Sequence, residues 1–129
     1  MIDQRLAKEQ VSVGLRVALR IIDAWDASPA QACKILRISQ STFRRASRNG
    51  VAGRLDLDQQ QRIAMVLGIH ASLRTAFTNP ANVTGFPSLK NDNTFFDGRS
   101  PLEVMSQGDM LSLYETFKRI DHLRYLGDT

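Results

Sequence analysis

Residues 28–50 read SPAQACKILRISQSTFRRASRNG, which predicts two short helices joined by a tight turn. Ser28 and Gln31 have the Ser-x-x-Gln spacing of a capping box, and Pro29 occupies a first helical position, where a missing N–H breaks no hydrogen bond. A helix is therefore predicted to begin here. Ser39 can cap a second helix across a turn of about three residues. This spacing predicts a helix-turn-helix, a motif whose second helix enters the major groove of DNA.

The positive charge of the chain is concentrated in this stretch. Between Ala27 and Leu55 there are six basic residues and no acid, which leaves 11 basic and 13 acidic residues in the rest of the chain. Cations gathered on a short helix are typical of a phosphate-binding surface. The alternative interpretation is a helical hairpin whose arginines are only solvated. The six basic residues are Lys34, Arg37, Arg44, Arg45, Arg48 and Arg54.

The candidate DNA contacts form two groups. Residues early on a recognition helix contact base edges. Arg44 could donate two hydrogen bonds to guanine, and Gln40 could form a pair of hydrogen bonds with adenine. The cations that follow are expected to hold phosphates. The expected base readers are Gln40, Ser41 and Arg44. The phosphate contacts are Arg45, Arg48 and Arg54, and the capping residue Ser39 completes the set.

Composition excludes several classes of protein. With 129 residues, of which 43% are hydrophobic, the chain can form one core or two small lobes that share one. Cys33 is the only cysteine, which excludes an intramolecular disulfide. No apolar run approaches the roughly 20 residues that span a bilayer, and the N-terminal sequence MIDQRLAKEQ lacks the apolar core of a signal peptide. We therefore expect a soluble, cytoplasmic protein with no membrane partner.

Helical periodicity extends on both sides of the motif. Residues 3–26 are expected to form one helix, and Trp25 is expected to pack under the helix-turn-helix rather than to stack on a ligand. Either of two aspartates near position 57 can cap a further helix over residues 59–77. Gly68 interrupts the pattern there, so the sequence leaves open whether this segment forms one helix or two.

The C-terminal part is predicted to begin with a loop. Helical periodicity disappears over residues 78–99, although three phenylalanines in this stretch indicate that part of it docks onto the body. Ser100-Pro101-Leu102-Glu103 then has capping-box spacing and predicts a short helix that stops at Gly108. Asp109 can cap the last helix. The predicted fold is all-α: an N-terminal helix, a helix-turn-helix, and a C-terminal helical lobe reached by a long loop.

Patterns typical of catalysis are not found in the sequence. His70 and His122 are the only histidines, and no Cys/His/Asp spacing fits a metal site. Ser112 and Asp121 lie nine residues apart on one helix, about 13 Å at 1.5 Å per residue, so they cannot form a triad with His122. A glycine-rich phosphate loop is also missing. We expect no enzymatic activity, no small-molecule substrate, no cofactor and no metal.

Two segments resemble known families. Residues 32–43, ACKILRISQSTF, resemble without a gap the helix-turn-helix of Xre-type bacterial repressors, except that Arg37 replaces the usual turn glycine. Residues 62–127 resemble the toxin-binding domain of antitoxins in the Xre/MbcA/ParS group. The second match depends on RI at 62–63, GIHASLR at 68–74 and NTFFDGRSPLEVM at 93–105. That family usually has a helix with a tryptophan before the asparagine, where this chain has a Pro/Gly-rich loop over residues 79–89.

The resemblance implies a function as well as a fold. It divides the chain into a DNA-binding region, residues 1–58, and a toxin-binding domain, residues 59–129 with the loop 78–99. It implies a homodimeric antitoxin that represses its own operon by binding operator DNA. It also implies that the last helix and tail cover the active site of a RES-domain toxin, an enzyme that consumes NAD.

The resemblance also implies which residues would contact the toxin. Aromatic and arginine side chains carry most interface energy, so the tail offers anchors for a toxin. The expected toxin contacts are Arg119, Leu123, Arg124, Tyr125 and Leu126. Leu123 and Tyr125 could instead complete the core of the protein itself. Two other functions stay open: a helix-turn-helix repressor without a toxin partner, and a protein-interaction module whose DNA binding is vestigial.

Overall fold

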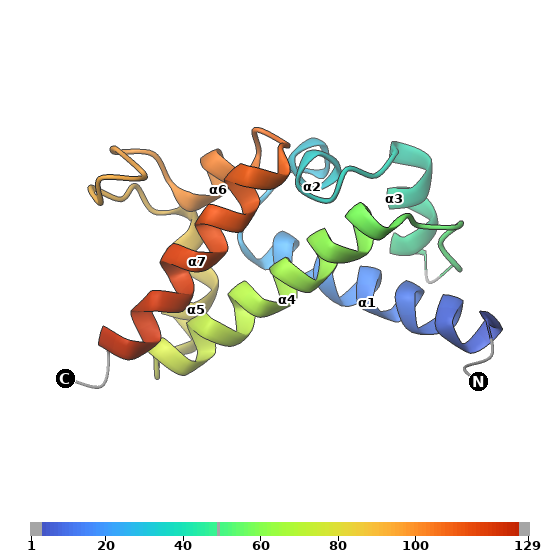
Figure 1. The fold of residues 1–129 in the computed structure, drawn as a ribbon, viewed down its shortest axis with the longest axis horizontal. Helices are drawn as coiled ribbons and strands as arrows, with labels where there is room; N and C mark the ends of the chain where they lie inside the picture. The colour runs from blue at the N-terminus through green and yellow to red at the C-terminus, as the bar shows by residue number, and fades with distance from the viewer. Residues whose placement is uncertain (1–3, 49, 127–129) are drawn as a thin grey trace.

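The computed structural model describes residues 4–48 and 50–126, and every regular element in these ranges is helical (Figure 1). The predicted all-α fold is confirmed. None of the helices in the described ranges is both long and apolar enough to cross a membrane. The elements are α1 (Gln4–Ala24), α2 (Pro29–Leu36), α3 (Gln40–Ser47), α4 (Leu57–Ala76), α5 (Pro80–Gly85), the 3-10 helix η1 (Phe86–Ser88), α6 (Pro101–Met105) and α7 (Met110–Leu126).

Two long helices that cross, α1 and α4, organise the molecule. Figure 1 shows α2 and α3 at one end of this crossing and α5, α6 and α7 at the other. Helix α4 packs most extensively against α7 and next against α1, so it contacts both halves of the chain. Its first turn is fixed by a capping box, in which Asp56 accepts from the N–H of Gln59 and the Gln59 side chain accepts from the N–H of Asp56.

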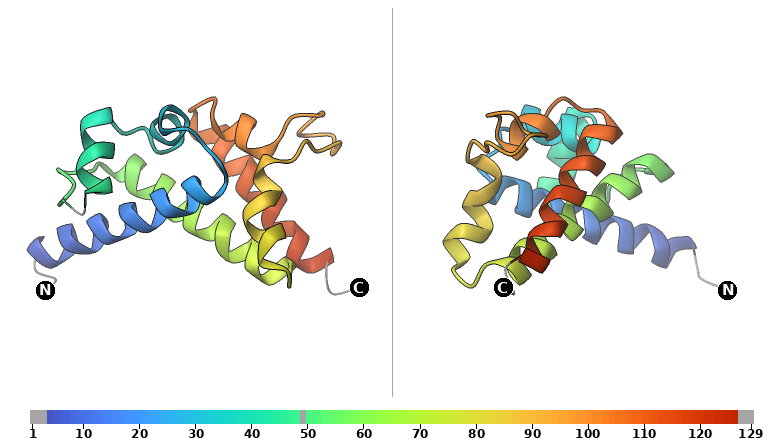
Figure 2. Two further views of the ribbon diagram at one scale, coloured as in Figure 1. Left: turned by 180° about the vertical axis from the view of Figure 1, so that it is seen from behind. Right: turned by 60° about the vertical axis from the view of Figure 1, so that its left-hand side comes forward.

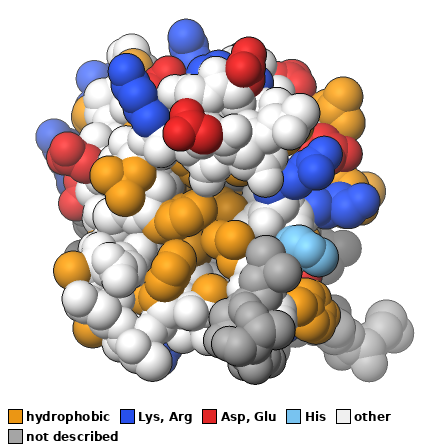
Figure 3. Space-filling view, turned by 90° about the vertical axis from the view of Figure 1, so that its left-hand side faces the viewer, with side chains coloured by type: hydrophobic (Ala, Val, Ile, Leu, Met, Phe, Trp, Pro, Cys, Tyr) orange, Lys and Arg blue, Asp and Glu red, His pale blue; other side chains and the backbone are white. Residues whose placement is uncertain are grey.

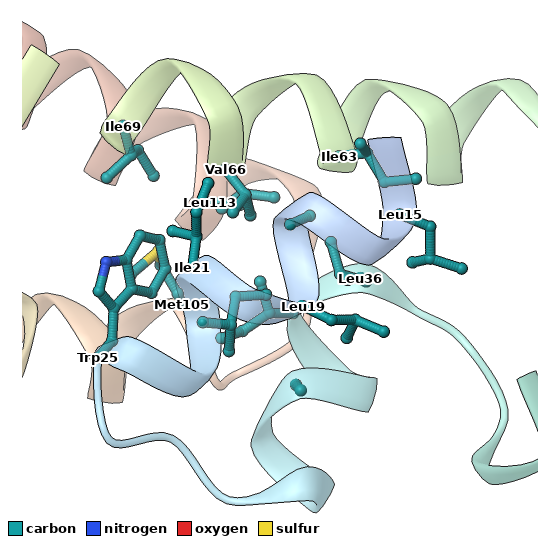
Figure 4. Packing of buried hydrophobic residues seen from close by; sticks show 14 of the residues in the cluster. Leu15, Leu19, Ile21, Trp25, Leu36, Ile63, Val66, Ile69, Met105 and Leu113 are labelled. Carbon is teal, nitrogen blue, oxygen red and sulfur yellow. The ribbon is translucent and has the colours of Figure 1, made fainter. Parts of the chain in front are cut away.

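One hydrophobic core joins the two halves. Figure 4 shows side chains of α1, α2, α4, α6 and α7 in the same cluster. Trp25 at the end of α1 is fully buried in this cluster, and its carbonyl accepts a hydrogen bond from Ser88 Oγ of η1. The residue expected to lie under the helix-turn-helix therefore contacts the C-terminal half. The largest fully buried side chains include Trp25, Leu15, Ile22, Ile35, Leu36, Ile69, Leu73, Met105, Leu113 and Ile120.

Gly68 does not break α4, which runs without interruption from Leu57 to Ala76. The physical reason for the glycine is close packing. A Cβ atom at position 68 would lie 2.9 Å from Cε1 of Phe117, because the aromatic ring of α7 packs directly on the α4 backbone there. The glycine thus permits the close approach of α4 and α7, the largest helix contact in the fold.

The segment 78–99 contains more helix than the sequence predicts. Asn79 caps α5 by accepting from the N–H of Ala81, and Pro80 lies at the start of this helix, where proline is favoured. A short helix therefore exists where a loop was expected in place of the family helix. The prediction that this segment docks is confirmed, because Val83, Pro87 and Phe96 are buried.

Candidate nucleic-acid and protein-binding surfaces

The helix-turn-helix has the predicted caps. Ser28 Oγ accepts from the N–H of Gln31 at 3.1 Å, and the N–H of Ser28 donates to Gln31 Oε1 at 2.8 Å, which completes the capping box of α2. Ser39 Oγ accepts from the N–H of Thr42 at 3.1 Å and so caps α3. These bonds satisfy orphan N–H groups at the first turns and fix where each helix begins.

Arg37 takes over the role of the turn glycine. It ends α2 with φ 56° and ψ 45°, in the left-handed region that glycine normally occupies. The side chain donates from Nε to Asp58 Oδ2 at 2.7 Å and from Nη2 to Asp56, and the carbonyl accepts from Gln59 Nε2 at 2.8 Å. Several contacts therefore hold the residue in a strained conformation. Its charge is compensated by the two aspartates, so Arg37 does not add to the basic surface of α3.

The first predicted site lies on α3. Ser41, Arg44, Arg45 and Arg48 line a hollow of about 510 Å³ together with Gly50. The three arginine side chains are exposed, and within residues 4–48 and 50–126 they pair with no carboxylate. The structure therefore brings most of the candidate DNA contacts together on one exposed helix face.

The remaining candidate contacts lie at the edges of this face. Ser39 and Gln40 are exposed at the first turn of α3. Arg54 is exposed in the connection to α4. This connection runs beside α3, because a Cβ atom at Gly53 would lie 3.5 Å from Arg45 Nη1.

A buried arginine that the sequence analysis did not assign joins the two halves. Arg62 is 4% exposed, and its Nη1 donates to the carbonyls of Ile35 at 3.2 Å and Gly108 at 2.7 Å. Its Nε donates to Asp58 Oδ2 at 2.9 Å. One side chain of α4 thereby holds the end of α2 and the turn before α7. The signal in the sequence was a charged residue next to Ile63, on the inner face of the helix.

The predicted toxin contacts at Arg119 and Arg124 already have partners within the chain. Arg119 lies over the ring of Phe95, 5.1 Å from the centroid, and its Nη2 is 3.7 Å from Glu115 Oε2. Arg124 Nε lies 3.1 Å from Asp121 Oδ1. Both arginines therefore stabilise the local structure of the C-terminal half as it stands.

The other predicted toxin contacts do not share one face of α7. Leu123 is half-buried, whereas Tyr125 is 59% exposed, as expected for residues about 200° apart around a helix. The hydroxyl of Tyr125 accepts from Arg124 Nη2 at 2.9 Å. The side chain of Leu126 lies outside the described residues. Of these positions, Tyr125 is the one with an exposed aromatic side chain.

The outer face of α7 carries further exposed side chains that the sequence analysis missed. Leu111 is 67% exposed and Tyr114 is 39% exposed, and three turns of helix separate Tyr114 from Tyr125. This spacing was the signal in the sequence. Beside these residues a mostly apolar hollow of about 700 Å³ opens between α4 and α7. Its lining consists of Gln61, Ala64, Met65, Met110, Leu111, Tyr114 and Phe117.

The end of the molecule opposite α3 also has an apolar character. Figure 3 shows hydrophobic side chains gathered at the centre of this face, with charged side chains along its upper rim. Phe77 at the end of α4 and Phe86 at the start of η1 are half-buried, and their ring centroids lie 5.6 Å apart. The C-terminal half thus presents apolar surface, whereas α3 presents cationic surface.

Comparison with known proteins gives this architecture a family. Residues 4–75 match the family described as the antitoxin Xre-like helix-turn-helix domain. An uncharacterized protein of Sinorhizobium fredii, y4oB, is 31% identical over 116 residues, which cover 89% of this chain and 87% of that protein. No solved structure matches the chain. The chain therefore belongs to the antitoxin Xre-like helix-turn-helix domain family.

Proposed function

We propose that the protein is the antitoxin of a toxin–antitoxin pair, which binds operator DNA through α3 and neutralises a RES-domain toxin through its C-terminal half. The observation that carries the proposal is the set of exposed, unpaired arginines on α3, at residues 44, 45 and 48. Unpaired cations on a recognition helix are available to phosphates and guanines. The family match over residues 4–75 supports the same assignment.

The DNA-binding part has a direct test. Fluorescence anisotropy would compare binding of the chain to its own upstream DNA and to scrambled DNA of equal length. Arg44→Ala should cost about 1 to 3 kcal/mol on the upstream DNA and much less on the scrambled DNA, whereas Arg48→Ala should weaken both alike. Equal losses on both DNAs for Arg44→Ala would contradict its role as a base reader.

The toxin-binding part places the partner on the outer face of α7. What supports it is the exposure of Tyr114 and Tyr125 beside an apolar hollow, since aromatic side chains next to apolar pockets commonly carry interface energy. In this proposal the protein is a cytoplasmic homodimer, as the two half-sites read by such motifs require. It is not an enzyme and needs no cofactor.

Co-purification with the product of the neighbouring open reading frame tests this part. Tyr125→Ala should lower recovery of the toxin and restore its NAD consumption in cells. Val51→Ala is the matched control, because Val51 is also 59% exposed but lies in the connection after α3. A neighbouring gene that encodes no RES-domain protein, or equal recovery with both variants, would count against the proposed partner surface.

A further inference from the structure

We infer that a second cationic site, formed by Arg16 and Arg20 of α1, receives a backbone phosphate of the DNA on the flank of α3 opposite Arg54. This inference rests on the proposed DNA binding and extends it to a helix outside the helix-turn-helix. Neither arginine belongs to the sites predicted from the sequence.

The site is a hollow of about 250 Å³ enclosed by three helices. Helix α1 contributes Arg16 and Arg20, the start of α2 contributes Ser28, and α3 contributes Phe43 and Ser47. The left view of Figure 2 shows α1, α2 and α3 around this region. The hollow is therefore built from the elements that position the recognition helix.

The charges of the hollow favour an anion. Arg16 and Arg20 lie one turn apart on the same face of α1, and within the described part of the chain neither forms an ion pair. The N-terminus of α2, capped by Ser28, adds partial positive charge on one wall. Asp23 is the one carboxylate among the lining residues, and it is exposed.

The position of the hollow favours DNA as the source of the anion. Around α3, Arg45 faces the Gly53 side, whereas Ser47 faces α1. A helix in the major groove, which is about 12 Å wide, has a phosphate backbone on each side. Arg45 and Arg54 can hold one backbone. Arg16 and Arg20 line the hollow on the other side of α3, beside the start of α2, and α2 is the motif helix expected to cross the second backbone.

The test measures salt dependence with Arg16→Gln and Arg20→Gln. A phosphate contact contributes about 0.9 to the steepness with which log K falls against log salt, so each variant should have a slope shallower by about 0.9. When salt is raised from about 50 to 200 mM, each variant should therefore lose roughly 3.5-fold less affinity than the wild type. The reduction should be equal on upstream and scrambled DNA, because phosphates carry no sequence information. Asp23→Asn should act in the opposite direction and tighten binding, since it removes a carboxylate from the same hollow.

Arg74→Gln is the matched control. It removes the same charge from an exposed residue of α4, at the end of that helix far from α3 (Figure 1), and should leave the slope unchanged. If the wild-type protein binds DNA and both α1 variants show the same salt slope as the wild type, this inference is overturned while the proposed function stands. Failure of the wild-type protein to bind DNA would overturn the proposed function and this inference together. If free inorganic phosphate at low millimolar concentration competes with DNA while the salt slopes of the α1 variants stay at the wild-type value, the hollow binds a small anion instead. That result would also contradict the inference.

Discussion

Replacement of Arg62 should show how strongly one side chain joins the DNA-binding and C-terminal halves. Arg62→Ala removes the donor to the carbonyls of Ile35 and Gly108 and leaves both acceptors unpaired. It also removes the bond to Asp58, although that carboxylate keeps its partner Arg37. The loss is therefore concentrated at the two backbone carbonyls.

The expected magnitude follows from these contacts. Hydrogen bonds that involve a charged group each contribute about 1.5 to 3 kcal/mol, so two lost bonds should lower the free energy of unfolding by about 3 to 6 kcal/mol. Arg62→Lys keeps the charge but loses the planar guanidinium group with its several N–H donors, so the free energy of unfolding should fall by an intermediate amount. Arg74→Ala is the control for an exposed arginine of the same helix, and it should change stability by less than about 0.5 kcal/mol.

Urea denaturation followed by circular dichroism measures the effect. For a domain of this size a loss of about 4 kcal/mol moves the urea midpoint down by about 2 M. A loss below about 1 kcal/mol for Arg62→Ala, or a loss equal to that of the Arg74 control, would refute the reasoning. Such a result would mean that water satisfies the two carbonyls as well as the arginine does.

Two further predictions concern packing and pH. Gly68→Ala should destabilise the protein by about 1 to 3 kcal/mol, because the added methyl group meets Phe117. Gly14→Ala should instead stabilise it by about 0.5 to 1 kcal/mol, since the nearest neighbour of the added methyl group is Ile63 Cγ2 at an ordinary 3.5 Å. Thermal unfolding of both variants measures these changes, and stability changes of the same sign would contradict the prediction. Hydrogen bonds from Arg37 lower the pKa of Asp56 and of Asp58 in the folded state, so their contribution to stability is complete above about pH 4 and is lost as pH falls through the lower folded values. Urea midpoints measured from pH 6 down to 2 should fall less steeply for Arg37→Gln than for the wild type, and parallel curves would contradict this.

The sequence predicts helices well where their ends carry local signals. Ser28, Ser39 and Ser100 were identified as caps from spacing alone, and each side chain accepts the expected backbone N–H. These bonds join residues three apart, so no knowledge of the tertiary structure is needed. The short helix ends at Met105, three residues before the predicted stop at Gly108, where φ is +92°.

Features that depend on tertiary contacts were harder to predict. Gly68 resembled a helix break because its partner, Phe117, lies 49 residues away in the chain. The sequence counted Arg37 as a surface cation, whereas Asp56 and Asp58 fold back onto it. Helix α5 was missed because six residues, of which the last is a glycine, give too short a periodic signal. The errors at Gly68 and Arg37 arise from contacts that spacing along the chain cannot reveal.

The residues of the candidate sites also differ in whether the sequence alone or only the folded chain reveals them. The arginines of α3 could be assigned because they are neighbours in sequence and share an exposed face. Arg16 and Arg20 come to lie beside Phe43 and Ser47 of α3 only through the packing of α1 against α2 and α3. On α7, the contact of Arg119 with Phe95 became visible only in the folded chain, whereas Asp121 lies three residues before Arg124 and is a partner that helical spacing alone could have indicated.

In the proposed function, the cations of α3 place the protein on its own upstream DNA. Hydroxyl-radical footprinting of that DNA, with wild-type protein and with the Arg44→Ala/Arg48→Ala double variant, tests this claim most directly. The wild type should protect two half-sites with centres about 10 base pairs apart, or a multiple of that spacing, and the double variant should lose both. Protection that persists in the folded double variant, or no protection by the wild type, would contradict the account.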